Sequence, residues 1–524
     1  MGRQPADVIY AAPRDDQTHG RQHYREAAVE AVGVVGLGTM GAGIAEVFAR
    51  AGLNVIGVEV DDAALERGRA NLTASTDKAV RKGKLSDAER DEIVGRVSFT
   101  VERGDLADVD LVVEAVPEIM EWKRELFADL DRICKPSAVL ATNTSSLSVT
   151  AIAATTSRPS QVVGMHFFNP APIMGLVEVV RTVLTGDGVA EGVADLARRL
   201  DKTPVIVGDR AGFVVNRLLL GYLNHACVLL ESGVATRDDI DTAMTKGAGL
   251  PMGPFTLLDL IGLDTSYEVI NVLFGESRDR RHAPAPLLRE LVSAGLLGRK
   301  AGHGFYGPDE EIVHDHGPKL ATTSVCVIAP DDALVNELDA KGFKAVHADP
   351  ADLSGVDADL VLAVSDRPVV EHAVRLSHPE RLVGVHLAGP VAEVASTAVT
   401  SPEAARAARD LMRILKRTPI ACKDRAEFVV NALLYPYLND AVRMLDSGYA
   451  SAEDIDTAMR LGCGYPAGPF ETLDAIGPAA VRDGLRALYA EYREPAFNPA
   501  PLLDQFVTAN LGFYESPPAA AKAG

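Results

Sequence analysis

The 524-residue sequence has few cysteines and too little positive charge to balance its acidic residues. Lys and Arg total 52 against 73 Asp and Glu, a formal net charge of −21, which argues against binding to a nucleic-acid backbone. No run of 18 apolar residues occurs, so a membrane-spanning helix is not expected. The five cysteines are odd in number and far apart, which indicates neither a disulfide framework nor a zinc site. They predict a reducing, cytoplasmic compartment and no metal: Cys134, Cys227, Cys326, Cys422 and Cys463.

The overall composition is that of an ordinary globular protein, with 47% apolar and 24% charged residues. The length predicts three or four domains. Residues 1–29 are polar and have no apolar segment of the secretory-signal type, so we interpret them as a flexible extension. Residues 516–524 read as a frayed tail.

A long internal repeat dominates the sequence. Residues 209–262 and 424–477 align without a gap at an offset of 215, with 33 identities in 54 positions. The repeated segments have helical periodicity and Gly and Pro punctuation. A helical module has therefore been duplicated.

Short apolar runs precede each helical module. Those before the first copy are separated by helical stretches, which predicts a parallel sheet with crossover helices, and those before the second copy repeat the pattern in shortened form. The expected fold is an α/β Rossmann domain and an all-α domain, followed by a degenerate, truncated Rossmann-like domain and a second helical domain. The expected boundaries are 30–208, 209–310, 323–421 and 422–515.

A glycine-rich turn follows the first apolar run, Ala31–Val35, and opens a helical stretch. Its three glycines suit a tight turn, the close approach of a pyrophosphate and helix–strand packing. Glu59 ends the next strand, 23 residues after Gly36, where a carboxylate binds the adenosine ribose. No Arg follows Glu59 directly, so NAD is favoured over NADP. The predicted loop residues are Gly36, Leu37, Gly38, Thr39, Met40 and Gly41.

Polar residues within apolar strands mark a second candidate site. His166 ends an apolar run and precedes two phenylalanines, a setting that suits a general base. Glu178 is flanked by valines, and a buried carboxylate needs a partner, which a nearby imidazole would supply. Taken singly, a core histidine and an edge-strand glutamate facing water are the better interpretations. Ser145 and Asn216, taken alone, read as loop and helix-cap residues.

Several long motifs occur in order: GLGTMGAG, VEAVPE, NTSSLSV, HFFNPAPIMGLVEVV, AGFVVNRLL and GAGLPMGPFTLLDLIGLD. Together they closely resemble the short-chain L-3-hydroxyacyl-CoA dehydrogenase family, over residues 31 to about 308. The duplicated architecture resembles the branch that oxidises 3-hydroxyadipyl-CoA in phenylacetate catabolism. The resemblance implies NAD-dependent oxidation of an (S)-3-hydroxyacyl-CoA, of the 3-hydroxybutyryl or 3-hydroxyadipyl type, to the 3-oxoacyl-CoA, as in fatty acid β-oxidation.

The resemblance also implies roles for individual residues. The catalytic set is His166, Glu178, Ser145 and Asn216, with His166 as base, Glu178 as its partner and the other two holding the substrate oxygen. Further cofactor contacts are implied at Glu118, Lys123, Asn143 and Lys300, and CoA contacts at Ser75 and Lys82. Arg81, Lys82 and Lys84 form a basic cluster that suits CoA phosphates or, equally, a solvated helix face.

The second half repeats part of this set. His386, Glu393 and Asn431 echo the first-half residues, but Ile328–Asp332 replaces the glycine loop and includes Pro330, which lacks an amide donor. We interpret this half as a remnant of an active site, without NAD and without the serine. The two helical modules are expected to pair within the chain as a pseudo-dimer, and further homo-oligomers remain open. Two alternatives stay in view: a non-catalytic NAD-binding structural protein, and a dehydrogenase of a CoA-free hydroxy acid.

Overall fold

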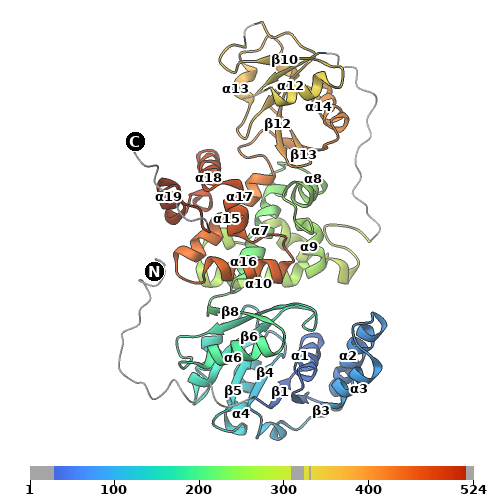
Figure 1. The fold of residues 1–524 in the computed structure, drawn as a ribbon, viewed down its shortest axis with the longest axis vertical. Coiled ribbons are helices and arrows are strands. Elements are labelled where there is room, and N and C mark those ends of the chain that lie inside the picture. Colours follow the sequence, from blue (N-terminus) through green and yellow to red (C-terminus); the bar gives the residue numbers. More distant parts are fainter. Residues whose placement is uncertain (1–28, 309–323, 330–331, 354, 515–524) are drawn as a thin grey trace, which may run out of the picture. The chain divides into compact units, whose positions relative to one another are not determined.

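The computed structural model describes residues 29–308, 324–329, 332–353 and 355–514 (Figure 1). The chain divides into two compact units, Met1–Arg217 with Ser447–Gly468, and Leu218–Asp446 with Pro469–Gly524. Each unit contains one sheet. The first also contains a segment of the second helical module, which folds against it. Of the expected flexible ends, residues 1–28 and 516–524 lie outside the described residues.

The first sheet has eight strands in the order β3-β2-β1-β4-β5-β6-β7-β8. All neighbours are parallel except β6 and β7, which are antiparallel. The expectation of a purely parallel sheet is therefore wrong at this pair. No helix lies between β6 and β7, and a direct connection of this length cannot return the chain to a parallel start. The strands are β1 Ala31–Val35, β2 Asn54–Val58, β3 Val97–Thr100, β4 Leu111–Glu114, β5 Val139–Thr142, β6 Val162–Phe167, β7 Leu176–Arg181 and β8 Thr203–Gly208.

Helices cover this sheet, which explains its unbroken apolar strands. Residues of β4, β5 and β6 are buried throughout, as expected for strands covered on both faces. The helix α4 is amphipathic and buries Leu126, Phe127 and Leu130. The helices are α1 Thr39–Arg50, α2 Asp62–Arg81, α3 Asp87–Gly95, α4 Met120–Ile133, α5 Val149–Ala153 and α6 Val189–Arg199, with 3₁₀ turns η2 Arg103–Leu106 and η3 Pro159–Gln161.

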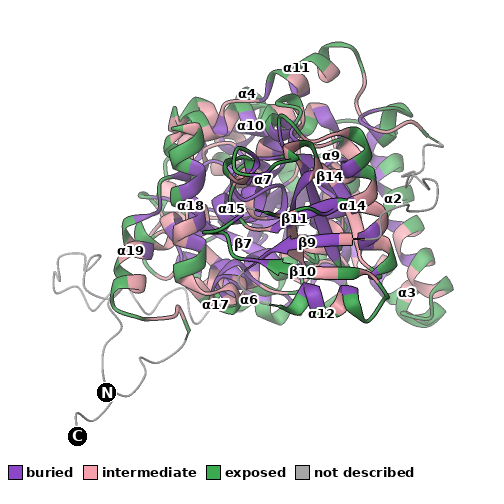
Figure 2. Ribbon diagram, turned by 90° about the horizontal axis from the view of Figure 1, so that it is seen from above, coloured by how far each residue is buried: buried purple, intermediate pink, exposed green. Residues whose placement is uncertain are grey.

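The second sheet has six strands in the order β10-β9-β11-β12-β13-β14. Strand β11 pairs with both β9 and β12. In the first sheet two strands stand at this place in the order, because β4 pairs with β1 and β5 pairs with β6. Strands β9 and β11 are buried for most of their length (Figure 2). The elements are β9 Ser324–Ile328, β10 Lys344–Ala348, β11 Leu360–Val364, β12 Leu382–Ala388, β13 Val391–Ser396, β14 Thr418–Lys423, α12 Ala333–Asp339, α13 Val370–Ala373, η7 Pro379–Arg381 and α14 Pro402–Ile414.

The helical modules share a buried aspartate that explains the repeated GPF motif. The Asp241 carboxylate accepts hydrogen bonds from the amides of Phe255 and Thr256 at the start of α9. A Cβ atom at Gly253 would lie 2.3 Å from Asp241 Cγ, so only glycine fits there. The helices are α7 Val215–Glu231, α8 Arg237–Thr242, η4 Ala243–Gly247, α9 Pro254–Ile261, α10 Leu263–Ser277, η5 Arg280–His282, α11 Pro286–Ser293 and η6 Arg299–Ala301, and in the second module α15 Val430–Asp446, α16 Ala452–Cys463, α17 Pro469–Ile476, α18 Pro478–Tyr492, η8 Pro495–Phe497 and α19 Pro501–Thr508.

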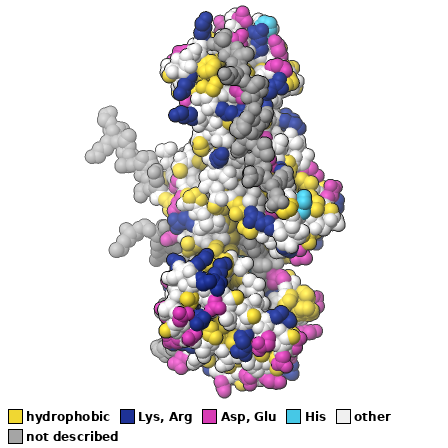
Figure 3. All heavy atoms as spheres, turned by 90° about the vertical axis from the view of Figure 1, so that its right-hand side faces the viewer, with side chains coloured by type: hydrophobic (Ala, Val, Ile, Leu, Met, Phe, Trp, Pro, Cys, Tyr) yellow, Lys and Arg dark blue, Asp and Glu magenta, His cyan; other side chains and the backbone are white. Residues whose placement is uncertain are grey.

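On the face shown in Figure 3, Lys and Arg side chains are interleaved with Asp and Glu. Among the described residues, no helix combines the length and the apolar character that crossing a bilayer requires. All five cysteines are free thiols. The described residues also contain no group of three or more His, Cys, Asp and Glu suited to a metal ion.

Candidate active site

The glycine loop links β1 to α1 with the geometry that its sequence predicts. Gly36 has φ +86°, and a Cβ atom there would lie 2.8 Å from the carbonyl oxygen of Ala115. A Cβ at Gly41 would lie 1.7 Å from the carbonyl oxygen of Gly36, so helix α1 can approach the loop only without a side chain. Gly38 instead faces open space, with no atom within 4 Å of a Cβ position. A ligand can therefore approach its backbone closely.

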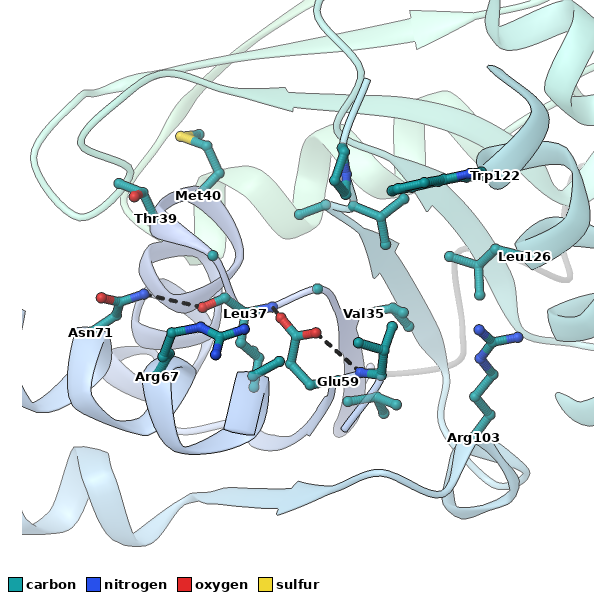
Figure 4. A pocket seen from close by; sticks show the side chains of 18 of the residues that line it. Val35, Leu37, Thr39, Met40, Glu59, Arg67, Asn71, Arg103, Trp122 and Leu126 are labelled. Carbon is teal, nitrogen blue, oxygen red and sulfur yellow. Dashed lines mark hydrogen bonds between the residues drawn. The ribbon is translucent and has the colours of Figure 1, made fainter. Parts of the chain in front are cut away.

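A pocket of about 1030 Å³ opens beside this loop (Figure 4). Glu59 lies in it, and its carboxylate accepts hydrogen bonds from the amides of Leu37, at 2.6 Å, and Val60, at 3.1 Å. An open glycine loop at a helix N-terminus with a carboxylate after the second strand fits NAD. The lining includes Gly36, Leu37, Gly38, Thr39, Met40 and Glu59 of the predicted set, together with Val35, Val58, Val60, Ala64, Arg67, Ala70, Asn71, Arg103, Ala115, Val116, Pro117, Trp122, Glu125, Leu126 and Asp129.

Several of these lining residues were not predicted from the sequence. Arg67 extends from α2 toward Glu59, and Asn71 on the same helix donates to the Leu37 carbonyl at 3.3 Å (Figure 4). Trp122, the only tryptophan of the chain, lines the opposite side from α4 and is 53% exposed. The signal for Arg67 and Asn71 is their spacing of four, which places both on one face of a helix. No pattern in the neighbouring sequence predicts that Trp122 lines the pocket.

The predicted base and its partner are brought together. His166 on β6 and Glu178 on β7 are directly opposite in the antiparallel pair, and Nδ1 of His166 lies 2.8 Å from Oε2 of Glu178. The other carboxylate oxygen accepts from the amides of Val214 and Val215, at 3.0 and 3.1 Å, where α7 begins. Glu178 is fully buried. All the acceptor capacity of this carboxylate is thus directed at one imidazole and one helix start.

Two phenylalanine rings enclose the imidazole. The ring centroid of Phe168 lies 4.6 Å and that of Phe213 lies 5.6 Å from the centroid of His166. Asn216 follows Val215 in the first turn of α7, the turn that Glu178 holds. The dyad therefore fixes the position of the imidazole and of the helix start that carries Asn216.

Ser145 is connected to the other predicted cofactor residues through Glu118. The Glu118 carboxylate accepts from the Ser145 amide at 2.9 Å, the Ser145 hydroxyl at 3.2 Å and the Thr144 hydroxyl at 2.6 Å. Burial opposes ionisation of Glu118, but Lys123 and the hydroxyl of Thr144 outweigh it and lower the pKa of this carboxyl. Glu118 is thus an anion that orders the Ser145 loop.

Lys123 was expected to contact the cofactor, yet it is only 1% exposed. Its ammonium group donates to Glu114 at 2.6 Å and to the Val116 carbonyl at 3.4 Å, and it lies 3.3 Å from Glu118. Those three partners match the three donors of a lysine. Neither Lys123 nor Glu118 lines the pocket, so in this structure Lys123 holds Glu118 in place.

The remaining predicted residues have other contacts. Asn143 accepts a hydrogen bond from the Phe167 amide at 2.8 Å, which ties the Ser145 loop to the end of β6. Lys300 lies in the second unit, where it pairs with Asp264. Ser75 is half-buried on α2, and Lys82 is exposed at the end of that helix. The pocket lining includes none of these four.

The second sheet carries a matching pair. Nδ1 of His386 lies 2.5 Å from Oε2 of Glu393, and the other oxygen of Glu393 accepts from the amides of Val429 and Val430 at 2.9 Å each. Nδ2 of Asn431 lies 3.4 Å from Nε2 of His386. Burial lowers the pKa of His386, but the Glu393 carboxylate outweighs it, and the net pKa is raised.

The segment Ile328–Asp332, at the end of β9, takes the place of the glycine loop and contains no glycine. Its Pro330 and Asp331 lie outside the described residues. His347 on β10 bonds with Nε2 to the Ala329 carbonyl at 2.8 Å and pairs with Asp332 through Nδ1 at 2.8 Å. His347 has the register position on β10 that Gly57 has on β2, so an imidazole stands where the first sheet has a glycine.

Comparisons with known proteins agree with this geometry. The model of the 3-hydroxyacyl-CoA dehydrogenase NAD binding domain matches residues 31–210, and that of the C-terminal domain matches residues 212–307 and 428–514. The chain is 35% identical over 489 residues to the 3-hydroxyadipyl-CoA dehydrogenase of Escherichia coli, covering 93% of this chain and 99% of the relative. It is 46% identical over 281 residues to a 3-hydroxybutyryl-CoA dehydrogenase of Mycobacterium tuberculosis, covering 53% of this chain and 98% of the relative.

A solved structure matches over nearly the whole chain. The crystal structure titled as 3-hydroxybutyryl-CoA dehydrogenase from Escherichia coli has a TM-score of 0.80 and 34% identity, and the match covers 92% of this chain and 99% of that one. Family models account for more than half of the sequence, and two independent comparisons extend over both halves. The chain therefore belongs to the 3-hydroxyacyl-CoA dehydrogenase family.

Proposed function

We propose that this protein oxidises an (S)-3-hydroxyacyl-CoA to the 3-oxoacyl-CoA with NAD, using His166 as the general base. The observation that carries the proposal is the buried His166–Glu178 pair, which lies in the same compact unit as the dinucleotide pocket. A paired, enclosed imidazole is costly as a mere core feature but suits proton transfer.

Each residue of the site has a distinct task. The glycine loop and Glu59 would hold NAD, which would supply the acceptor for the hydride that leaves C3 of the substrate. His166 removes the hydroxyl proton through Nε2, because Nδ1 is held by Glu178. The carboxylate fixes the tautomer and favours the protonated imidazole. Ser145, ordered by Glu118, and Asn216, on the helix start held by Glu178, hold the substrate oxygen where charge changes.

The experiment is a pair of matched substitutions, His166→Gln and His386→Gln. Both remove an imidazole bonded to a buried glutamate. We expect His166→Gln to lower kcat about 10²–10⁴-fold and His386→Gln to leave it unchanged, in an assay of NADH formation. Undiminished turnover by His166→Gln would overturn the proposed role.

We further propose 3-hydroxyadipyl-CoA as the preferred substrate. The proposal is supported by the relative of that name from Escherichia coli, which is 35% identical over both halves of this chain. A solved structure titled 3-hydroxybutyryl-CoA dehydrogenase also covers both halves, so a kinetic comparison has to decide between the two substrates. The discriminating measurement is kcat/KM for 3-hydroxybutyryl-, longer-chain and 3-hydroxyadipyl-CoA. A flat profile would contradict this preference.

The two alternatives make different predictions. A structural NAD-binding protein would bind NAD without turning over any hydroxyacyl-CoA. A dehydrogenase of free hydroxy acids would reduce acetoacetate with NADH but not acetoacetyl-CoA. The intact His166–Glu178 pair disfavours the first alternative, and the family match favours CoA thioesters over the second.

We also propose that the two helical modules pair within the chain as a pseudo-dimer, and that the protein is cytoplasmic. Tyr222 on α7 and Tyr437 on α15, which are equivalent positions of the repeat, have ring centroids 6.2 Å apart. Around them, Arg281 pairs with Asp440, and the ring of His225 lies 5.4 Å from that of Phe497. Contact between equivalent residues is what a two-fold axis produces.

A further inference from the structure

One segment of the second helical module belongs to the first compact unit. Residues Ser447–Gly468 include α16 and fold with the first sheet, whereas the helices on either side of the segment belong to the other unit. Helix α16 packs against β7 and β8. Strand β7 carries Glu178, so this segment lies against the strand that holds the partner of the base.

Gly462 on α16 contacts the immediate surroundings of Glu178. A Cβ atom at Gly462 would lie 2.8 Å from Cγ2 of Val215 and 3.1 Å from Cδ2 of Leu176. The amide of Val215 is one of the two donors to the Glu178 carboxylate, and Leu176 precedes Glu178 by two residues on the same face of β7. The absence of a side chain at Gly462 lets α16 approach both.

Two side chains of the same segment, Cys463 and Tyr449, lie near the buried Glu178 carboxylate. Burial and the nearby Glu178 carboxylate together raise the pKa of Cys463 at the end of α16, and the same two causes raise the pKa of Tyr449. The Tyr449 hydroxyl donates to the Gly208 carbonyl at 2.8 Å, and Arg210 lies over its ring at 4.9 Å. Glu178 is therefore within electrostatic range of two side chains from the second half of the chain.

The reciprocal contact occurs in the second unit. Gly247 on η4, 215 positions before Gly462, has a Cβ position 2.9 Å from Cγ2 of Val430 and 3.5 Å from Cβ of Val391. Val430 donates its amide to Glu393, as Val215 does to Glu178. Each helical module thus covers the dyad of the other half. The dyad of the first half lies in the unit that also contains the pocket beside the glycine loop.

We propose that the segment Ser447–Gly468 is a positioning element of the first active site, which keeps Glu178 dry and aligned with His166. The inference rests on the proposed role of His166. A dry carboxylate stabilises a protonated imidazole more strongly than a hydrated one, because charges interact more strongly at low dielectric. In this proposal the second half of the chain takes part in the reaction at the active site of the first half.

The test uses the full-length chain and two equivalent substitutions, Gly462→Ala and Gly247→Ala. The added methyl groups would meet the equivalent valines at nearly equal distances, so both variants should lose similar thermal stability. We expect only Gly462→Ala to lower kcat, by about 10–100-fold, and to move the acid limb of the pH profile of kcat/KM to lower pH. KM for NAD should stay unchanged, since the pocket lining does not include Val215 or Leu176.

Wild-type kcat and pH profile in Gly462→Ala, or the same loss of kcat in Gly247→Ala, would overturn the proposal. If Gly462→Ala does not fold, Tyr449→Phe tests the same segment by removing one hydroxyl group and its bond to Gly208. It should shift the acid limb in the same direction with a several-fold lower kcat, and an unshifted profile would contradict the proposal. The variant His166→Gln distinguishes failure of the proposed base from failure of the positioning element. If His166→Gln stays active, the proposed base is wrong. If it is inactive while Gly462→Ala behaves as wild type, only the positioning element is wrong.

Discussion

At the scale of single residues, Glu178 has two tasks that only a carboxylate performs at once. It accepts from the imidazole of His166 on one oxygen and from two amides on the other. The glutamine in Glu178→Gln keeps the shape but can present its amide nitrogen to only one side. If that nitrogen faces the imidazole, it donates to Nδ1 and leaves the proton on Nε2, so Nε2 cannot act as a base. If it faces the two amides, donor groups oppose donor groups.

We therefore expect Glu178→Gln to lower kcat by about 10²–10⁴-fold, as loss of the orienting carboxylate does in a catalytic triad. NADH formation and circular dichroism, measured together, separate lost chemistry from lost folding. The matched control is Glu393→Gln, which disturbs the equivalent amides in the second unit. A control variant as inactive as Glu178→Gln would show that the effect is structural.

Glu427 provides a prediction about pH. It occupies the position of Gly212 with φ +61°, is 1% exposed, and leaves Oε1 without a hydrogen-bond partner. Burial, opposed by Asn431 and reinforced by Asp366, raises its pKa to about 7. A carboxyl whose pKa rises on folding binds its proton more tightly in the folded state. Its stabilising contribution is present at low pH and is lost as pH rises toward 7.

The expected result is that Glu427→Gln melts at a higher temperature than wild type at pH 8, with the difference shrinking toward pH 5. The free-energy difference should not exceed about 3.4 kcal/mol, because the pKa rises from 4.5 to about 7 and each unit corresponds to about 1.36 kcal/mol. Thermal melts across this range measure it. Glu403→Gln, at an exposed site on α14, is the control and should show no such trend. A pH-independent difference for Glu427→Gln would refute the raised pKa.

At the scale of elements, the pocket combines the end of β2, which Glu59 directly follows, with α2, which carries Arg67. We propose that Glu59 excludes the extra phosphate of NADP by its charge and hydrogen-bonds the ribose hydroxyls. Arg67 extends toward Glu59 (Figure 4), and it is a cation of the kind that binds such a phosphate. The preference for NAD should therefore depend on Glu59 alone.

Replacing that carboxylate in Glu59→Ser should lower kcat/KM for NAD and raise it for NADP, by roughly tenfold each, about 1.4 kcal/mol per change. Adding Arg67→Gln to Glu59→Ser should abolish the gain for NADP while changing NAD use little. Quenching of Trp122 fluorescence, the only tryptophan signal of the chain, reports binding of either cofactor without turnover. NADP use that survives loss of Arg67 would contradict its role.

The elements that could be predicted are those with a local pattern. The apolar run Ala31–Val35 is β1 residue for residue, and the repeat predicted equivalent helices in both halves. The pairing of His166 with Glu178 followed from the cost of an unpaired buried carboxylate. The place of Trp122 in the pocket lining and the antiparallel direction of β7 could not be predicted, because both depend on which distant segments come together in the fold. The same limit applies to Lys123. The family motif predicted that this residue belongs to the site, but it did not predict that its side chain is buried.

At the scale of the whole molecule, the repeat predicted that two helical modules would pair but not that they would exchange segments. Sequence similarity assigns α16 to the second module, whereas contacts assign it to the first unit. Sequence similarity reflects the common ancestry of the two copies, whereas packing depends on which apolar faces remain uncovered after folding. In a chain with two copies, each module can cover the other half, which ties the halves together more strongly than a linker does.

If the modules pair within one chain, a cross-link between equivalent positions must join residues of the same molecule. Tyr222 and Tyr437 are suited to this, because their rings lie 6.2 Å apart and are 215 residues apart in sequence. In a Tyr222→Cys/Tyr437→Cys variant, a short bis-maleimide should give a monomer-sized product of about 56 kDa with altered gel mobility. Each single variant, and wild type with its five native cysteines, should give no such product. Because a two-fold pair between chains would instead bring Tyr222 of two molecules together, a product of twice the mass, formed by the single variants as well, would mean that the repeat serves assembly between chains.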